Sequence, residues 1–105
     1  MPIIDTRQLP VRDKGPGWSG RIFHSANMTF AHWDFKAGSS IHRHDHGQEE
    51  VWHVVEGELE VTIDGFKHHA GPGFVAIIPP NADHSVVALT DGKAIVADFP
   101  LRDGF

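Results

Sequence analysis

The stretch SSIHRHDHGQEEVWHVVEGELE, residues 39–60, places four of the chain's nine histidines in its first fifteen positions, three of them just before a glutamate pair. Imidazole and carboxylate groups together are suitable ligands for a divalent first-row metal. Side chains two residues apart on a strand point to the same face, which makes His44 and His46 a pair, and Glu50 keeps their parity. We therefore expect these three side chains to reach one interior surface, with His84 from another strand as the fourth ligand.

The remaining histidines of this region have simpler interpretations. His42 shares the parity of His44 and could replace a ligand, although a place at the rim of a barrel explains it as well. Glu49 and His53 have the opposite parity to Glu50, so we expect both to face away from the site. The pair at 68–69 follows a turn signal and indicates a solvated strand end rather than a second metal site.

Short strands, rather than helices, have to position these residues. Apolar, β-branched and aromatic runs occur at 21–24, 27–35, 50–55, 58–63, 74–78, 84–89 and 93–99. Turn signals separate them, among them the Asp-Gly pairs at 64–65 and 91–92, which favour hairpins. No long stretch has a helical period. This pattern predicts an all-β sandwich or barrel of antiparallel strands, of which the jelly roll is one closed form.

Two spaced motifs resemble those of the cupin family. The first matches at Gly38, His44, His46, Glu50 and Gly57, and the second matches at Gly73, Pro79 and His84. Asn81 stands where the family usually has glycine, and asparagine also tolerates a positive φ. Ala88 replaces a terminal asparagine that is not a metal ligand. The motifs cover residues 38–88, and the chain resembles a small single-domain cupin with a double-stranded β-helix fold.

The resemblance implies that His44, His46, Glu50 and His84 are ligands of one divalent transition metal per chain. Such a set leaves one or two positions open for water or substrate, which is what catalysis needs. Iron, manganese, nickel, zinc and copper all accept these ligands, and the sequence does not choose among them.

The segment VADFPLRDGF, residues 96–105, is similar to the tail of small pectin-degradation cupins that open unsaturated uronates. On that comparison Asp98 would be a base, Phe99 a wall of the pocket and Arg102 an anchor for a carboxylate. Asp98 and Phe99 are adjacent, however, and adjacent residues on a strand point to opposite faces.

Three functions from different classes follow from such a site. The first is a metal-dependent lyase or isomerase that acts on an oxygenated small molecule, such as an unsaturated sugar acid. The second is an iron-dependent dioxygenase, and the third is a barrel that binds a small ligand without catalysis. A site of this kind identifies chemistry but not a reaction. We favour an enzyme, and among enzymes a lyase or isomerase.

The composition of the chain indicates which partners and which cellular location to expect. The chain has 105 residues and a formal net charge of −5, so a nucleic-acid partner is not expected. It has no cysteine, no apolar run long enough to span a bilayer and no signal-peptide pattern at its amino end, which together predict a cytoplasmic protein without a membrane partner. We expect an N-terminal arm and loop at 1–20 and one barrel domain at 21–105. The run 50–55 is apolar on both faces, which favours a homodimer.

Overall fold

Ten strands and one short 3-10 helix, η1 (Thr6–Gln8), form the part of the chain that the computed structural model describes, residues 3–103. The strands are β1 (Arg12–Asp13), β2 (Trp18–His24), β3 (Thr29–Phe35), β4 (Ser40–His44), β5 (Glu49–Glu56), β6 (Leu59–Ile63), β7 (Phe66–Ala70), β8 (Val75–Ile78), β9 (His84–Ala88) and β10 (Gly92–Phe99). Seven of them overlap the seven predicted runs, so the all-β prediction is confirmed. The outer ends of the predicted domain ranges, residues 1–2 and 104–105, lie outside the described residues.

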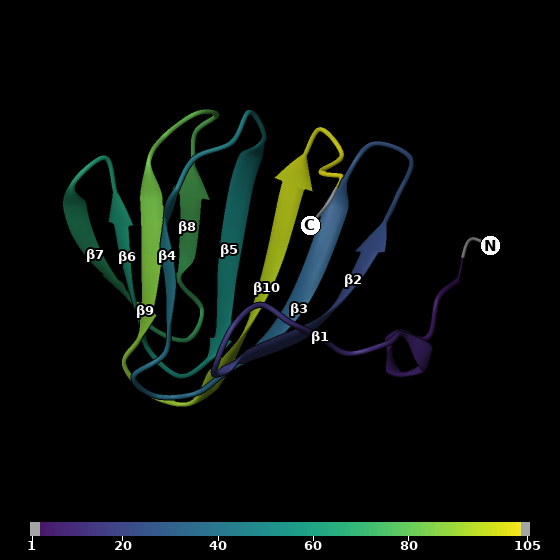
Figure 1. The fold of residues 1–105 in the computed structure, drawn as a ribbon, viewed down its shortest axis with the longest axis horizontal. Helices are drawn as coiled ribbons and strands as arrows, with labels where there is room; N and C mark the ends of the chain where they lie inside the picture. The colour runs from purple at the N-terminus through teal and green to yellow at the C-terminus, as the bar shows by residue number, and fades with distance from the viewer. Residues whose placement is uncertain (1–2, 104–105) are drawn as a thin grey trace.

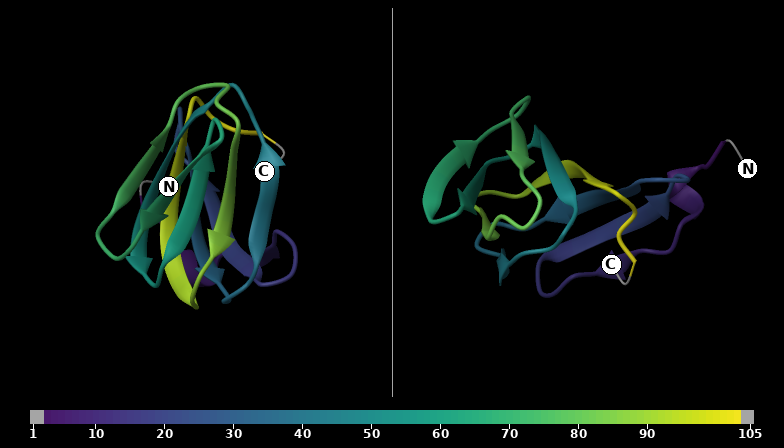
Figure 2. Two further views of the ribbon diagram at one scale, coloured as in Figure 1. Left: turned by 90° about the vertical axis from the view of Figure 1, so that its left-hand side faces the viewer. Right: turned by 90° about the horizontal axis from the view of Figure 1, so that it is seen from above.

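The strands form two antiparallel sheets, in the orders β1-β2-β3-β10-β5-β8 and β4-β9-β6-β7 (Figure 1). Figure 2 shows these sheets as two layers with the core between them. From β3 onward the chain crosses repeatedly from one sheet to the other, and only β6 and β7 are successive in the same sheet. This is the predicted jelly-roll arrangement. Within residues 3–103 no helix has the length and apolar character to cross a membrane.

Alternation along β5 decides which side chains face the core. Trp52 and Val54 are buried together with Glu50, as their shared parity predicts. His53 and Val55 lie on the opposite face and are exposed. The same alternation on β10 turns Ala94, Val96 and Asp98 inward, so the carboxyl group of Asp98 reaches the interior beside β5.

The predicted N-terminal arm is partly built into the larger sheet. β2 begins at Trp18, three residues before the predicted start of the barrel, and β1 pairs with it. The Trp18 side chain is 1% exposed and packs against Trp33, Phe35 and Trp52. The glycines and proline before it resemble a loop in sequence, but they form the turn of the β1–β2 hairpin.

Of the two hairpins predicted at Asp-Gly pairs, the structure contains one. Asp64 and Gly65 form a two-residue turn between β6 and β7, with φ values of 48° and 84°, so this hairpin prediction is confirmed. The prediction of a hairpin at Asp91-Gly92 is wrong, because β9 and β10 belong to different sheets. A short connection in a sandwich can carry the chain between layers as well as reverse it within one.

Candidate metal centre

Three histidines converge between the sheets, each from a different element. His44 ends β4, His46 lies in the loop that crosses to β5, and His84 begins β9. One ring nitrogen from each lies within 4.8 Å of the others. The ring centroids of His44 and His84 are 4.3 Å apart, and those of His46 and His84 are 5.0 Å apart. The three rings are therefore close enough for a single ion to contact all of them.

Glu50 approaches these rings from the larger sheet. Its Oε1 lies 3.3 Å from Nε2 of His46, and its Oε2 lies 3.2 Å from Nε2 of His84. The indole Nε1 of Trp52 donates a hydrogen bond of 2.7 Å to Oε2 and orients the carboxylate. Glu50 is 3% exposed. The four residues predicted as ligands thus lie side by side, with an acid group touching two of the three imidazoles.

The reason for this convergence differs from the prediction. His44, His46 and Glu50 do not share one strand, because β4 ends at His44 and β5 begins at Glu49 in the other sheet. The four residues between the strands cross the gap between the layers, so parity does not connect His44 with Glu50. The backbone N–H of Asn81 donates to the His46 carbonyl at 2.8 Å, which ties this loop to the turn before β9. Asn81 has a φ of 65°, as its place in the motif predicts.

Backbone carbonyls orient two of the rings. Nδ1 of His44 lies 2.8 Å from the His42 carbonyl, and Nδ1 of His84 lies 2.9 Å from the Ala82 carbonyl. A carbonyl only accepts, so Nδ1 carries the proton and Nε2 is left with its lone pair, the arrangement typical of metal-binding histidines.

The hydrogen-bond pattern of the triad fits a metal ion. Among the described residues, Nε2 of His84 and both ring nitrogens of His46 are buried without a hydrogen-bond partner. Buried polar atoms are rarely left so, and each such case needs an explanation. A donor set of imidazole nitrogens and a carboxylate, with lone pairs aimed at one point, is compatible with a divalent transition metal.

Asp98 and Arg102 complete the polar floor of the site. Asp98 lies opposite Glu50 in the β10–β5 register and is fully buried. Nη1 of Arg102 donates to Glu50 Oε1 at 3.1 Å and lies 3.5 Å from Asp98 Oδ2. The backbone N–H of Arg102 donates to the buried hydroxyl of Thr29 at 2.9 Å, which fixes the segment after β10 against β3. Both predicted catalytic residues therefore lie beside the predicted ligands.

Burial and close contacts separate the ionisation of the two acids. Burial raises the pKa of Asp98, the charge of Glu50 raises it further, and the pKa reaches about 8 although Arg102 opposes the change. Burial also acts to raise the pKa of Glu50, but the close contacts with the His46 and His84 imidazoles and the hydrogen bond from Trp52 outweigh it and hold that pKa well below its usual range. Near neutral pH the metal-free site therefore holds an ionised Glu50 and a protonated Asp98.

The pKa values of His44 and His84 shift in opposite directions. Burial lowers the pKa of His44. For His84 burial acts in the same direction, but the close contact with the negatively charged Glu50 and the hydrogen bond to the Ala82 carbonyl together raise its pKa above the ordinary value.

These pKa shifts predict that metal-free protein loses stability as pH rises from about 4 to about 8. An unfolded Asp ionises near pH 4, whereas folded Asp98 keeps its proton to about pH 8, so the folded state binds more protons across this window. The raised pKa of His84 acts in the same direction above about pH 6.5. The lowered pKa values of His44 and Glu50 act in the opposite direction, below about pH 6.5 and below about pH 4.5 respectively, so the loss of stability is steepest above about pH 6.5. After treatment with a chelator, we expect the melting temperature to fall between pH 5 and pH 8, and to fall much less in Asp98→Asn. Equal slopes in the two proteins would contradict the assignment.

Other predicted residues lie apart from the triad. His42 is exposed at the rim, and a register shift in β4 between Ile41 and His44 breaks the parity that linked it to the ligands. Phe99 is 52% exposed on the outer face of the larger sheet, so its predicted place as a pocket wall is wrong. Asp98 takes the inward position, and its neighbour must point out. Residues 68–69 are exposed within β7, a strand too polar to be recognised in the sequence.

A small cavity adjoins the triad. It is lined by Lys14, Trp33, Ile41, His44, Glu50, Trp52, Val96 and Arg102. Its volume is about 20 Å³, enough for an ion or one water-sized group. Lys14 lies in the segment predicted as an N-terminal arm and loop, and no pattern in the sequence marked it as a wall residue.

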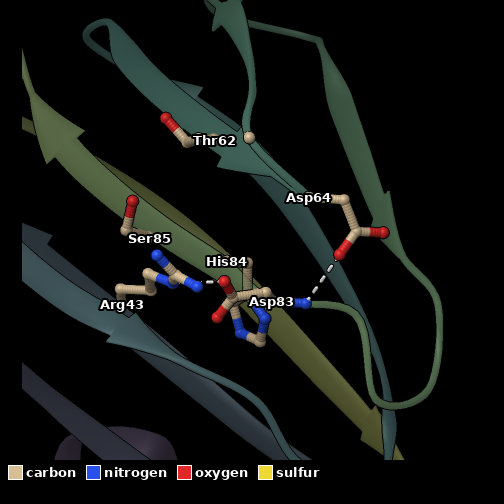
Figure 3. Close-up of a pocket in the computed structure, with 7 residues that line it drawn as sticks. Arg43, Thr62, Asp64, Asp83, His84 and Ser85 are labelled. Carbon is tan, nitrogen blue, oxygen red and sulfur yellow. Dashed lines mark hydrogen bonds and ion pairs between the residues drawn. The ribbon is translucent and has the colours of Figure 1, made fainter.

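A larger, open pocket of about 410 Å³ lies beside β4, β6 and β9. Figure 3 shows the side chains that line it. His84 is the one member of the triad that lines it. Arg43 and Asp83 form an ion pair there, and Asp64 accepts a hydrogen bond from the Asp83 backbone. Its charged side chains therefore pair with one another rather than converge on a ligand, and the smaller cavity is the better candidate for chemistry.

Comparison with known proteins gives matches over most of the chain. The family model described as Cupin domain matches residues 31–100. The dimethylsulfoniopropionate lyase DddW of Ruegeria pomeroyi is 33% identical over 66 residues, which is 63% of this chain and 43% of DddW. This chain thus aligns with less than half the length of that curated relative.

Two solved structures align over nearly the whole chain. An RmlC-like cupin from Shewanella frigidimarina has a TM-score of 0.88 and 28% identity, with 95% of this chain and 91% of that chain covered. KdgF from Halomonas sp. has a TM-score of 0.87 and 27% identity, with 94% and 93% covered.

Proposed function

Because the chain belongs to the cupin family, we propose that it is a metal-dependent lyase or isomerase acting on a carboxylate-bearing small molecule, such as an unsaturated sugar acid. The observation that carries this proposal is the close approach, between the two sheets, of three imidazoles, Glu50, a buried acid and an arginine. A set of metal-binding residues alone would fit a protein that only binds a metal or a small ligand. A protonatable acid and a cation at the same point support chemistry on a charged substrate.

In this proposal His44, His46, Glu50 and His84 hold one divalent transition metal. When bound, such an ion supplies Lewis-acid stabilisation of negative charge on substrate oxygens. The backbone carbonyls that fix His44 and His84, and the Trp52 indole that fixes Glu50, preorganise the donor atoms.

In this proposal Asp98 transfers a proton to or from the substrate. A pKa of about 8 suits a group that gives and takes a proton near neutral pH. Its place against Glu50 puts the carboxyl group beside the ligands without solvent access. The guanidinium of Arg102, whose Nη1 donates to Glu50, lies at the same point and supplies the positive charge that binds the carboxylate of the substrate. The segment Pro100–Arg102, which Thr29 and Gln48 hold through its backbone, keeps this guanidinium in place.

The comparisons support a substrate of this class. The tail that carries Asp98 and Arg102 is similar to that of pectin-degradation cupins, and KdgF from Halomonas sp. aligns over 94% of the chain. The direct assay follows the loss of ultraviolet absorbance of an unsaturated uronate. Turnover that needs the metal supports the proposal, and no turnover with iron, manganese, nickel, zinc or copper rejects it.

The similarity to DddW favours a second lyase substrate, dimethylsulfoniopropionate, which also carries a carboxylate. Release of a volatile sulfide from that compound, with no reaction of the uronate, would select it. An iron-dependent dioxygenase remains the alternative if the protein holds iron and consumes oxygen. A module that binds a small ligand is the alternative if neither lyase substrate nor oxygen is consumed.

We also propose that a second copy of the chain covers the outer face of the larger sheet. Exposed apolar side chains lie in adjoining rows there, on β8, β5 and β10: Val75, Ile77, Val55, Ile95 and Phe99. An apolar face of this extent on a lone chain is unusual. We expect light scattering of the wild type to give about twice the chain mass of 11.6 kDa. The Ile77→Lys variant should give the mass of a single chain. A wild-type mass near 11.6 kDa would remove this proposal.

A further inference from the structure

We infer that Lys14, from the turn of the β1–β2 hairpin, is a specificity-determining residue that binds the anionic group of the substrate together with Arg102. This inference rests on the proposed function of the same site and adds a residue and a charge requirement to it. Lys14 and Arg102 line the cavity that His44 and Glu50 also line.

The β1–β2 hairpin fixes the backbone position of Lys14. The Lys14 backbone N–H donates to the Trp18 carbonyl at 2.9 Å, and the Trp18 N–H donates to the Gly15 carbonyl at 3.2 Å. Trp18 is itself buried and packs edge-on against Trp33 and Trp52, which are walls of the same cavity. The turn beyond Lys14 is seated too, because the Lys36 N–H donates to the Gly17 carbonyl at 3.0 Å. Lys14 is thus presented to the cavity by rigid structure and not by a loose arm.

The size of the cavity indicates where the substrate lies. A volume of about 20 Å³ accommodates only the group that meets the metal site, so the rest of a sugar-sized substrate lies at the mouth. Lys14 is an exposed residue that also lines the cavity, which places it at that mouth. Arg102 is 16% exposed and reaches from the floor.

Charge identifies the group that these residues recognise. The chain has only nine Lys and Arg residues and a net charge of −5, yet two of these nine line one small cavity. An ammonium and a planar guanidinium on one cavity favour a carboxylate and disfavour a cationic group at that end of the substrate. The inferred ligand class is therefore an acid with its carboxylate at the mouth.

Binding of D-galacturonate, compared with neutral D-galactose, tests this inference without depending on turnover. We expect galacturonate to bind the purified protein more tightly than galactose does. Lys14→Gln should weaken galacturonate binding about 5- to 10-fold, as expected for loss of one charge-assisted hydrogen bond, and leave galactose binding unchanged. Lys14→Arg should retain most of the affinity. Lys67→Gln, which removes an exposed lysine on β7, is the matched control and should have no effect. Metal content is measured in every variant and should not change.

Two results would overturn the inference: equal galacturonate affinity in Lys14→Gln and wild type, or equal affinity of the wild type for galacturonate and galactose. Failure of the proposed reaction is a separate result. If no unsaturated uronate is turned over but galacturonate binding depends on Lys14, the reaction is wrong and the anion site stands. If the uronate is turned over with the same KM in Lys14→Gln, the reaction stands and the role of Lys14 is wrong.

Discussion

Replacing His84 with alanine is expected to lower the metal affinity of the protein by more than about 100-fold, since loss of a partner outside the ligand set alone costs about 10- to 100-fold. His84 is the most buried of the three histidines, and its Nε2 faces Glu50 and the neighbouring rings. Among the described histidines, only His44, His46 and His84 bring ligand atoms together, although the ring centroid of His42 lies 5.8 Å from that of His44 at the exposed rim. Elemental analysis of the purified variant measures the effect.

The matched control is His53→Ala. His53 is an exposed histidine on the outer face of β5, and its loss should leave metal content unchanged. Circular dichroism and thermal melting establish that each variant is folded. His44→Ala provides a second test at a less buried position, in case removal of the His84 side chain disrupts the interior. Full metal occupancy in a folded His44→Ala or His84→Ala protein would contradict the ligand assignment.

Asp98→Asn is expected to reduce turnover of the uronate by about 10²- to 10⁴-fold, the usual contribution of a positioned acid or base. The amide keeps the shape of the side chain beside Glu50 but cannot exchange a proton. KM should change little, because Arg102 and the metal still bind the substrate. Metal content should also stay the same, since the proposed ligand set does not include Asp98.

Asp34→Asn is the control for this variant. Asp34 is an exposed acid on β3 that pairs with Lys93, remote from the triad in sequence and register. Its replacement should leave turnover unaltered. If Asp98→Asn keeps wild-type turnover, Asp98 does not transfer the proton. If it instead loses its metal, Asp98 belongs to the ligand set, as its grouping with His46 and Glu50 permits.

The spacing of the motifs predicted which ligand candidates meet, but not how they meet. Positions such as Asn81, where the chain adopts a positive φ, are fixed by the turns of the fold, so their spacing carries information about residues distant in sequence. The prediction that His44, His46 and Glu50 lie on one strand is wrong, although the three residues are neighbours in space. Periodicity cannot distinguish a continuous strand from two strands of facing sheets joined by a short crossing, and here the chain crosses after His44.

Other features depended on contacts that the sequence does not encode locally. β7 has the polar sequence FKHHA and forms because β6 pairs with it after a favourable turn. The sequence required one of Asp98 and Phe99 to face outward, and only the register of β10 against β5 decides that it is Phe99. Lys14 gave no signal because its role depends on the Trp18 hairpin folding over the cavity.

The most direct test of the account is an anomalous-scattering crystal structure of protein purified from its native host, with the metal identified by elemental analysis. We expect one transition metal ion per chain, with the imidazoles of His44, His46 and His84 and the carboxylate of Glu50 as its protein ligands. A metal-free protein that still turns over substrate, or an ion bound elsewhere while these four side chains remain unligated, would contradict it.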